Sequence, residues 1–211
     1  MTQHDWNANY ASNELPWDTG APDPFLVEAI ERGIVPRGRA LDIGCGTGTN
    51  ALWLAAKGFD VLGLDLAPLA IERASAKAKA IAPATHCRFE VGDFLAGELP
   101  QPGFQLVFDR GCFHVFDKRD QQAEFAARVA RLLSPDGAWL SLIGSTEGPA
   151  REMGPPRRNA REIVGALEPS LQILTLRAIE FEPIAGEKTP PKAWLCVSSR
   201  RELPAQPSTR W

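Results

Sequence analysis

Residues 41–49 read LDIGCGTGT and lie between a buried apolar run, Arg39 to Ile43, and a helical pattern. The glycines of this junction, Gly44, Gly46 and Gly48, permit positive φ angles and let a ligand touch the backbone. The helix that follows offers unpaired N–H groups and a partial positive charge at its first turn. The pattern indicates a strand, a glycine-rich turn and a helix that together receive a flat or anionic ligand.

The spacing of the glycines argues against two common nucleotide sites. A dinucleotide site would have the pattern GxGxxG and therefore a glycine at position 49, but Thr49 stands there and the third glycine is Gly48. The GxxxxGK[ST] pattern of a phosphate-binding P-loop does not occur. The sequence therefore disfavours NAD binding and nucleotide hydrolysis. A tight turn without a ligand is the structural alternative, which Asp42 and two acidic strand ends disfavour.

Short apolar runs alternate with helical patterns along the chain. The expected strands are Arg39 to Ile43, Val61 to Asp65, Cys87 to Val91, Phe104 to Asp109, Ala138 to Ile143, Leu171 to Glu182 and Ala193 to Ser199. The expected helices are Thr49 to Lys57, Pro68 to Ala80, Arg119 to Leu133 and a short one from Ala160 to Leu167. Ser134 to Gly137 is expected to be a turn before the fifth strand.

This alternation predicts an α/β fold with a doubly wound, seven-stranded, mostly parallel sheet and helices on both faces. Only about ten residues join the last two strands, too few for a helical crossover, so the last strand is expected to run antiparallel. In such sheets ligands bind beyond the carboxyl ends of the strands.

Two acidic residues end neighbouring strands at that edge. Asp65 ends the second strand, where a carboxylate can accept hydrogen bonds from both hydroxyls of a ribose. Asp93 ends the third strand, where it can accept a hydrogen bond from an exocyclic amine, and Phe94 is expected to form an apolar wall for a purine ring. Each Asp alone could instead be a helix cap or a solvated loop end. Their joint placement predicts a slot for adenosine.

At these residues the sequence resembles the class I S-adenosylmethionine-dependent methyltransferases. The segment from Asp42 to Gly48, then Asp65, then Gly92-Asp93-Phe94 occur in the order that this family uses. The resemblance implies a Rossmann-like methyltransferase fold, S-adenosylmethionine as cofactor and S-adenosylhomocysteine as product. It places the glycine loop beside the methionine moiety, Asp65 at the ribose and Asp93 at the adenine.

Two further segments narrow the resemblance. Pro16-Trp17-Asp18-Thr19-Gly20 and Phe108-Asp109-Arg110-Gly111-Cys112-Phe113 look like the thiopurine, halide and thiol methyltransferase branch. In that branch the tryptophan segment folds over the cofactor, and the arginine lies at the cofactor and substrate pocket. The predicted cofactor contacts are Trp17, Asp42, Gly44, Cys45, Gly46, Gly48, Asp65, Leu66, Asp93, Phe94 and Arg110.

Arg110 and His114 are the candidate catalytic residues. Arg110 could alternatively be a surface cation paired with Asp109. His114 is a candidate general base, with a histidine held for local structure as the alternative. Trp17 could be a hydrophobic plug as well as a cofactor contact. Cys112 is expected to line the pocket rather than act as a nucleophile.

Composition limits the function classes. The 211 residues are 44% hydrophobic, enough for one core, so a single domain is expected over 1–211, with a lid at 1–35, a core at 36–202 and a flexible tail at 203–211. The net charge of −3 provides no basic field for nucleic acid. No signal peptide or membrane span is visible, and four scattered cysteines predict a reduced protein of the cytoplasm without a metal site.

The methyl acceptor is expected to be a small molecule in a mostly apolar, lidded pocket, and the protein a monomer or weak homodimer. The walls are expected from Gly111 to Asp117, Ser145 to Asn159 and Pro183 to Lys192, which carry Phe113, Phe116 and Met153. Cationic side chains in two of these loops could attract an anionic acceptor: Arg151, Arg157, Arg158, Lys188 and Lys192. A binding protein without turnover and a nicotinamide oxidoreductase are the competing interpretations.

Overall fold

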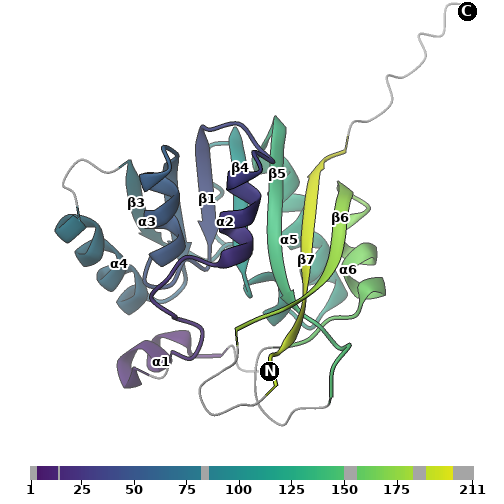
Figure 1. Cartoon of the computed structure of the whole chain (residues 1–211), viewed down its shortest axis with the longest axis horizontal. Coiled ribbons are helices and arrows are strands. Elements are labelled where there is room, and N and C mark those ends of the chain that lie inside the picture. The colour runs from purple at the N-terminus through teal and green to yellow at the C-terminus, as the bar shows by residue number, and fades with distance from the viewer. Residues whose placement is uncertain (1–3, 14, 82–85, 150–155, 183–188, 202–211) are drawn as a thin grey trace, which may run out of the picture.

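The computed structural model describes residues 4–13, 15–81, 86–149, 156–182 and 189–201, which form one seven-stranded sheet flanked by helices (Figure 1). The strands are β1 (Arg39–Ile43), β2 (Asp60–Asp65), β3 (Cys87–Val91), β4 (Phe104–Arg110), β5 (Leu133–Gly144), β6 (Leu171–Glu180) and β7 (Lys192–Arg200). The helices are α1 (Trp6–Ser12), α2 (Pro24–Glu31), α3 (Thr49–Ala56), α4 (Pro68–Ile81), α5 (Arg119–Leu132) and α6 (Ala160–Leu167), with a 3-10 turn, η1 (Phe113–Val115).

The strand order is β3-β2-β1-β4-β5-β7-β6. The first five strands pair in parallel, and β7 pairs antiparallel with both β5 and β6. The predicted α/β sheet with its reversed last strand is confirmed. Because parallel strands end at one edge, the loops after β1 to β4 lie together, and Figure 1 shows α1 just beyond this edge.

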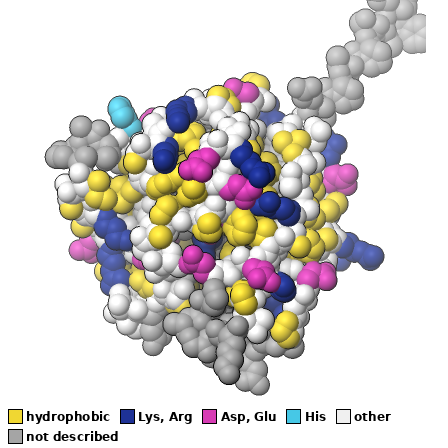
Figure 2. All heavy atoms as spheres, viewed as in Figure 1, with side chains coloured by type: hydrophobic (Ala, Val, Ile, Leu, Met, Phe, Trp, Pro, Cys, Tyr) yellow, Lys and Arg dark blue, Asp and Glu magenta, His cyan; other side chains and the backbone are white. Residues whose placement is uncertain are grey.

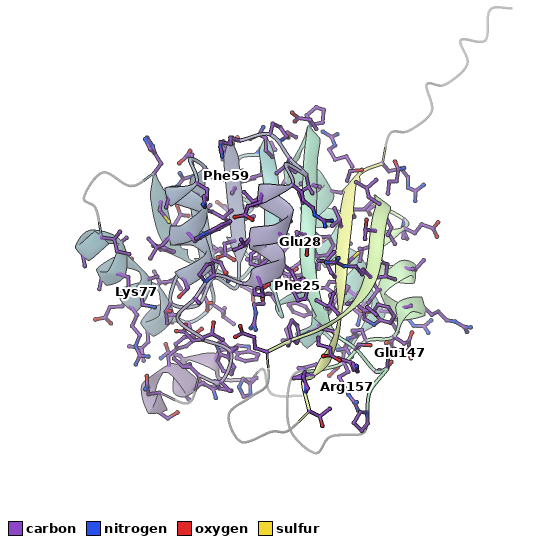
Figure 3. All side chains as sticks on the ribbon, in the orientation of Figure 1. Phe25, Glu28, Phe59, Lys77, Glu147 and Arg157 are labelled. Carbon is purple, nitrogen blue, oxygen red and sulfur yellow. The ribbon has the colours of Figure 1, made fainter. Side chains whose placement is uncertain are left out.

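Helices cover both faces of the sheet. Leu26 of α2 and Leu54 of α3 pack into one apolar layer, whereas Phe125 of α5 and Ile163 of α6 pack into the other. Figure 3 shows Phe25 and Glu28 of α2 lying over the middle of the sheet. Glu28 Oε2 lies 3.0 Å from Arg177 Nη2, so an ion pair joins α2 to β6.

The expected turn at Ser134 to Gly137 is wrong, because β5 already begins at Leu133. The pairing with β4 shifts register between Phe104 and Leu106, which accommodates these residues in the strand. A Cβ atom on Gly137 would lie 2.5 Å from the carbonyl oxygen of Phe104, so the glycine permits a close strand approach rather than a turn.

Helices α1 and α2 were not predicted within the segment 1–35. Each begins at an aspartate whose side chain accepts a backbone N–H, Asp5 from Ala8 and Asp23 from Phe25. The predicted division into lid, core and tail stays a prediction, and residues 203–211 lie outside the described residues.

Charges of both signs are interspersed with apolar side chains on the face that Figure 2 shows. Within the described ranges, no helix combines the length and the hydrophobicity that crossing a membrane requires. Cys45, Cys87, Cys112 and Cys196 are free thiols.

Candidate active site

The glycine loop joins β1 to α3, and hydrogen bonds from β2 fix its backbone. The N–H groups of Gly44 and Cys45 donate to the carbonyl oxygen of Leu64 at 2.8 and 3.1 Å. The N–H of Gly46 donates to Asp65 Oδ2 at 2.8 Å. Strand β2 therefore braces the loop through its backbone and through its terminal carboxylate.

The three glycines have left-handed backbone angles, with φ of 68° at Gly44, 55° at Gly46 and 81° at Gly48. A Cβ atom would lie 3.1 Å from Cys112 Cβ at Gly44 and 3.0 Å from the Tyr10 hydroxyl at Gly46. Turn geometry and close packing therefore already require glycine here. A ligand at this loop would meet backbone groups.

Asp65 is 9% exposed at the end of β2. Its Oδ1 accepts the N–H of Ala67 at 2.9 Å, and its Oδ2 accepts that of Gly46. Burial raises the pKa of this carboxyl, while the N–H donors oppose that effect. Contact with ribose hydroxyls would use the lone pairs that these bonds leave and stays a prediction. Leu66, 38% exposed at the same edge, likewise stays a predicted contact.

Asp42 lies inside the protein rather than at the edge. Its carboxyl accepts a hydrogen bond from the N–H of Ala51 in the first turn of α3, and Oδ2 has no partner among the described residues. Burial, with Asp65 and Asp109 nearby, raises its pKa to about 8. Asp42 therefore holds α3 against β1, and its predicted contact with the cofactor would be indirect.

Asp93 follows β3 and caps the turn after it. Its Oδ1 accepts the N–H groups of Leu95 and Ala96 at 2.8 and 3.1 Å. Phe94 points into the core, where its ring lies 4.6 Å from that of Phe125 between centroids. Because the ring is buried, little of it is left to form the predicted purine wall. The sequence shows that an aromatic residue follows the strand but not which way its side chain points. Asp93 stays a predicted adenine contact.

Aromatic side chains from α1 and from the predicted tryptophan segment cover the glycine loop. Trp17 meets Trp6 and Tyr10 edge to face, with centroids 5.9 and 6.4 Å apart, and hydrogen-bonds to the Tyr10 hydroxyl. Arg73 of α4 donates to the carbonyl oxygen of Tyr10 at 2.7 Å. Burial and the nearby Asp65 raise the pKa of Tyr10, so its hydroxyl is protonated. Trp17 therefore packs as a plug over the loop, and its cofactor contact stays a prediction.

A chain of polar contacts joins the same segment to the glycine loop. Thr47 Oγ1 donates to Asp18 Oδ2 at 2.7 Å, and Lys77 Nζ of α4 donates to Thr47 Oγ1 at 2.5 Å. Trp17 therefore packs on Tyr10, and Asp18 binds Thr47 of the glycine loop, so both residues are held over the loop.

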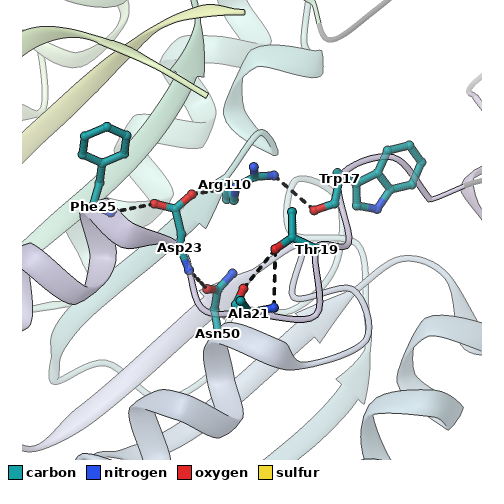
Figure 4. A network of polar contacts seen from close by, with 7 residues as sticks. All are labelled: Trp17, Thr19, Ala21, Asp23, Phe25, Asn50 and Arg110. Atoms are coloured by element: carbon teal, nitrogen blue, oxygen red, sulfur yellow. Dashed lines mark hydrogen bonds and ion pairs between the residues drawn. The ribbon is translucent and has the colours of Figure 1, made fainter. Parts of the chain in front are cut away.

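Arg110 stands at the end of β4 and reaches across to the amino-terminal segment (Figure 4). Its Nε donates to Asp23 Oδ2 at 2.8 Å, its Nη1 donates to the carbonyl oxygen of Trp17 at 3.3 Å, and its guanidinium lies 5.0 Å from the ring centroid of Phe181. The alternative pairing with Asp109 is wrong, because Asp109 points the other way, into the core.

Asp109 holds the turn that presents Arg110. It is fully buried; its Oδ1 accepts the N–H groups of Cys112 and Phe113 at 3.0 and 2.9 Å, and its Oδ2 accepts the indole N–H of Trp139 at 3.0 Å. Burial raises the pKa of this carboxyl, and its donors oppose that effect. The Asp-Arg-Gly motif therefore combines a structural residue with one that faces outward.

His114 is 3% exposed, and its Nδ1 accepts the N–H of Gly144 at 2.8 Å. Burial, with the Arg158 and Arg110 charges nearby, lowers its pKa to about 3. A neutral ring whose Nδ1 accepts a hydrogen bond carries its proton on Nε2, so neither nitrogen is free to take a proton. This arrangement favours the alternative, a histidine that holds η1 to β5, and the general-base role of His114 stays a prediction.

A pocket lies between the amino-terminal segment and the glycine loop, and Trp17, Gly44 to Thr47, Asn50 and Arg110 contribute to its lining. Its lining carries the carboxylates of Asp18, Asp23 and Glu182 against the single guanidinium of Arg110. This acidic excess beside the glycine loop fits a ligand that carries a sulfonium and an ammonium group, as S-adenosylmethionine does. The described residues therefore fit the methionine end of that cofactor.

The predicted acceptor walls are only partly described. Phe113 is buried against Phe125 and Trp139, so it belongs to the core and not to a wall, whereas Phe116 is half-buried. Met153, Arg151 and Lys188 lie outside the described residues.

Three of the predicted cationic side chains already have partners. Arg158 Nη2 lies 2.6 Å from Asp117 Oδ1, so this charge is already paired, and Lys192 pairs with Glu180. Arg157 donates to the carbonyl oxygen of Pro149 at 2.9 Å, near Glu147 in Figure 3.

Sequence reasoning did not single out Asp23, Thr47 or Tyr10 as site residues. Asp23 followed by Pro24 is a helix-start signal, so α2 was predictable from it. The pairing of Asp23 with a residue 87 positions later has no local pattern.

Comparisons with known proteins agree with this architecture. The family model for thiopurine S-methyltransferase matches residues 1–188. A probable thiol methyltransferase 2 of Arabidopsis thaliana is 34% identical over 72% of this chain, and the match covers 65% of that relative, just under two thirds. Thiocyanate methyltransferase 1 of Brassica oleracea is 29% identical over 84% of this chain and 75% of its own length.

A solved structure from work on the conversion of a disulfide bond into a thioacetal group during echinomycin biosynthesis superimposes with a TM-score of 0.74. It is 30% identical and covers 88% of this chain and 84% of its own.

Proposed function

Because this chain belongs to the thiopurine S-methyltransferase family, we propose that it transfers a methyl group from S-adenosylmethionine to a small-molecule acceptor with a soft nucleophile, such as a thiol, a thiopurine or a halide. The observation that carries the proposal is the acidic pocket between the glycine loop and the amino-terminal segment, which the guanidinium of Arg110 also lines. The names of the thiol and thiocyanate methyltransferase relatives support the acceptor class.

The residues that would hold the cofactor lie along one edge of the sheet. The glycine loop with Cys45 and the carboxylates of Asp18 and Glu182 would bind the methionine end, Asp65 and Leu66 the ribose, and Asp93 the adenine. When bound, S-adenosylmethionine supplies an electrophilic methyl group on a sulfonium. The protein's task is then to hold an acceptor about 3 to 3.5 Å from the methyl carbon, in line with the departing sulfur, and to exclude water.

Positioning is sufficient for a soft acceptor. A thiolate or a halide arrives without a proton to remove, so no general base is needed. The buried His114, whose Nδ1 accepts the N–H of Gly144 and whose pKa is lowered by burial, agrees with a mechanism that uses no general base. Trp17 and Tyr10 would cover the loop and keep water from the sulfonium.

Turnover with labelled S-adenosylmethionine and a panel of thiols, thiopurines, iodide and thiocyanate tests the proposal. Methylation of at least one of these acceptors supports it. The competing interpretation is a binding or regulatory protein that keeps the fold and the cofactor, and it predicts tight S-adenosylhomocysteine binding with no product from any acceptor. Calorimetric titration with NADH tests the oxidoreductase interpretation. An oxidoreductase would give heat on titration with NADH and no heat with S-adenosylhomocysteine.

We also propose a cytoplasmic protein, since its free thiols suit a reducing compartment. A monomer or weak homodimer stays our expectation for the oligomeric state, which ultracentrifugation measures.

A further inference from the structure

Asp23 is joined to three separate parts of the molecule. Its Oδ1 accepts the N–H of Phe25 at 2.9 Å and caps α2, and its Oδ2 accepts Nε of Arg110 at 2.8 Å. Its own N–H donates to Asn50 Oδ1 of α3 at 2.8 Å. Figure 4 shows these contacts as one network, and Asp23, Asn50 and Arg110 all line the pocket. Asp23 thus connects α2, the first turn of α3 and the end of β4.

The contacts of Arg110 set the direction of its guanidinium. Asp23 takes Nε, the carbonyl oxygen of Trp17 takes Nη1, and the ring of Phe181 lies against the guanidinium. Nη2 has no hydrogen-bond partner among the described residues, and the side chain lines the pocket. The fork of the guanidinium is planar and rigid, so fixing Nε and Nη1 also fixes the direction of Nη2.

The pair is shielded from water. The side chain of Asp23 is 4% exposed and that of Arg110 is 20% exposed. A buried charge-assisted hydrogen bond is short and strong, whereas either charge left alone in this place would be poorly solvated. The ion pair with the Asp23 carboxylate therefore stabilises the observed rotamer of Arg110.

We propose that Asp23 is a positioning residue: it aims Arg110 into the pocket and fastens the Trp17 segment over the glycine loop through that one side chain. This inference rests on the proposed function, since the pocket must receive S-adenosylmethionine for the aim to matter. Asp23 acts through Arg110, so its effect on ligand binding disappears when Arg110 can no longer be aimed.

Calorimetric titration of the whole protein with S-adenosylhomocysteine tests this as a double-mutant cycle. The single variants are Asp23→Asn, which keeps the volume and the helix-capping ability, and Arg110→Lys, which keeps the charge but loses the fork. We expect each to raise the Kd about tenfold. The double variant Asp23→Asn/Arg110→Lys is expected to bind no more than about twofold weaker than the weaker single variant, because both changes remove the same interaction.

Val129→Ala is the matched control for stability. It truncates a buried residue of α5 on the other face of the sheet, lowers the free energy of unfolding and leaves the Kd unchanged. A merely structural Asp23 would behave like this control, with lower stability and an unchanged Kd, and would overturn the inference. A hundredfold, additive loss in the double variant would overturn it as well, because the two residues would then act independently.

The failure of the two proposals can be told apart. A parent protein that gives no heat with S-adenosylhomocysteine refutes the proposed function, and the positioning role with it. A parent that binds tightly, with an Asp23→Asn variant that binds equally well, refutes only the positioning role.

Discussion

The hydroxyl oxygen of Tyr10 lies 3.0 Å from the point where a Cβ atom would stand on Gly46. Helix α1 therefore packs directly on the glycine loop, and the loop has room for the phenol only because residue 46 lacks a side chain. Gly46 also has a φ of 55°, which disfavours other residues. A side chain at position 46 would therefore be disfavoured twice, by the contact with Tyr10 and by the left-handed backbone.

We predict that Gly46→Ala lowers the free energy of unfolding by about 2 kcal/mol or more, through the left-handed backbone and the contact with Tyr10. Tyr10→Phe removes the hydroxyl and should restore the contact part of the loss but not the backbone part. Urea unfolding of the parent, both single variants and the double variant measures this. An equal loss in the presence and absence of the hydroxyl would show that Tyr10 is not the obstacle.

Asp65→Ala is predicted to weaken S-adenosylhomocysteine binding by about 1 to 3 kcal/mol, because the ribose hydroxyls lose an acceptor and Gly46 loses its brace. Calorimetry at a temperature where the variant stays folded gives the Kd. Asp60→Ala is the control, since Asp60 lies at the other end of β2, exposed and near Arg88. A Kd equal to that of the parent would remove Asp65 from the cofactor site.

The pKa of His114 predicts a loss of stability in acid. Burial lowers the pKa from 6.5 to about 3, so the unfolded chain binds a proton between these values and the folded protein does not. The contribution of His114 is complete above pH 6.5 and is lost as the pH falls, by about 2 kcal/mol at pH 5. His114→Asn keeps an acceptor for the N–H of Gly144 and should lack this part of the pH dependence. Parallel slopes for parent and variant between pH 7 and pH 5, in denaturant titrations, would contradict the assignment.

Local patterns predicted the sheet because each strand carries its own signal. The apolar runs, the glycine turn and the short connection between the last two strands indicate the strands and their directions with little help from distant residues. The predicted turn at Ser134 to Gly137 was wrong for a physical reason. The residues are typical of a turn, but Gly137 is needed where β5 passes close to Phe104.

The site was predictable to the level of the strand ends and no further. Sequence placed Asp65, Asp93 and Arg110 at one edge, since parallel strands end together. The sequence did not predict that the rings of Phe94 and Phe113 point into the core. It also did not predict that Arg110 pairs with Asp23 rather than with its neighbour Asp109. Both features depend on packing between segments that lie far apart in the chain. His114 shows the same limit, as only its burial and the N–H of Gly144 decide its protonation.

The last prediction concerns the pH dependence of methyl transfer to thiols. If the protein supplies no general base, as the burial and the hydrogen bond of His114 favour, an acceptor thiol loses its proton before it reaches the pocket, and its own pKa then governs the rate. We expect kcat/KM to rise about tenfold per pH unit below the pKa of the thiol and to level off above it. An acidic aromatic thiol and a less acidic alkyl thiol should therefore give inflections that differ by the difference between their pKa values. His114→Asn should leave both inflections in place, because the ring takes no part in the proton transfer. If both thiols instead gave the same inflection, a group of the protein would be acting as the base, and positioning alone would not explain the reaction.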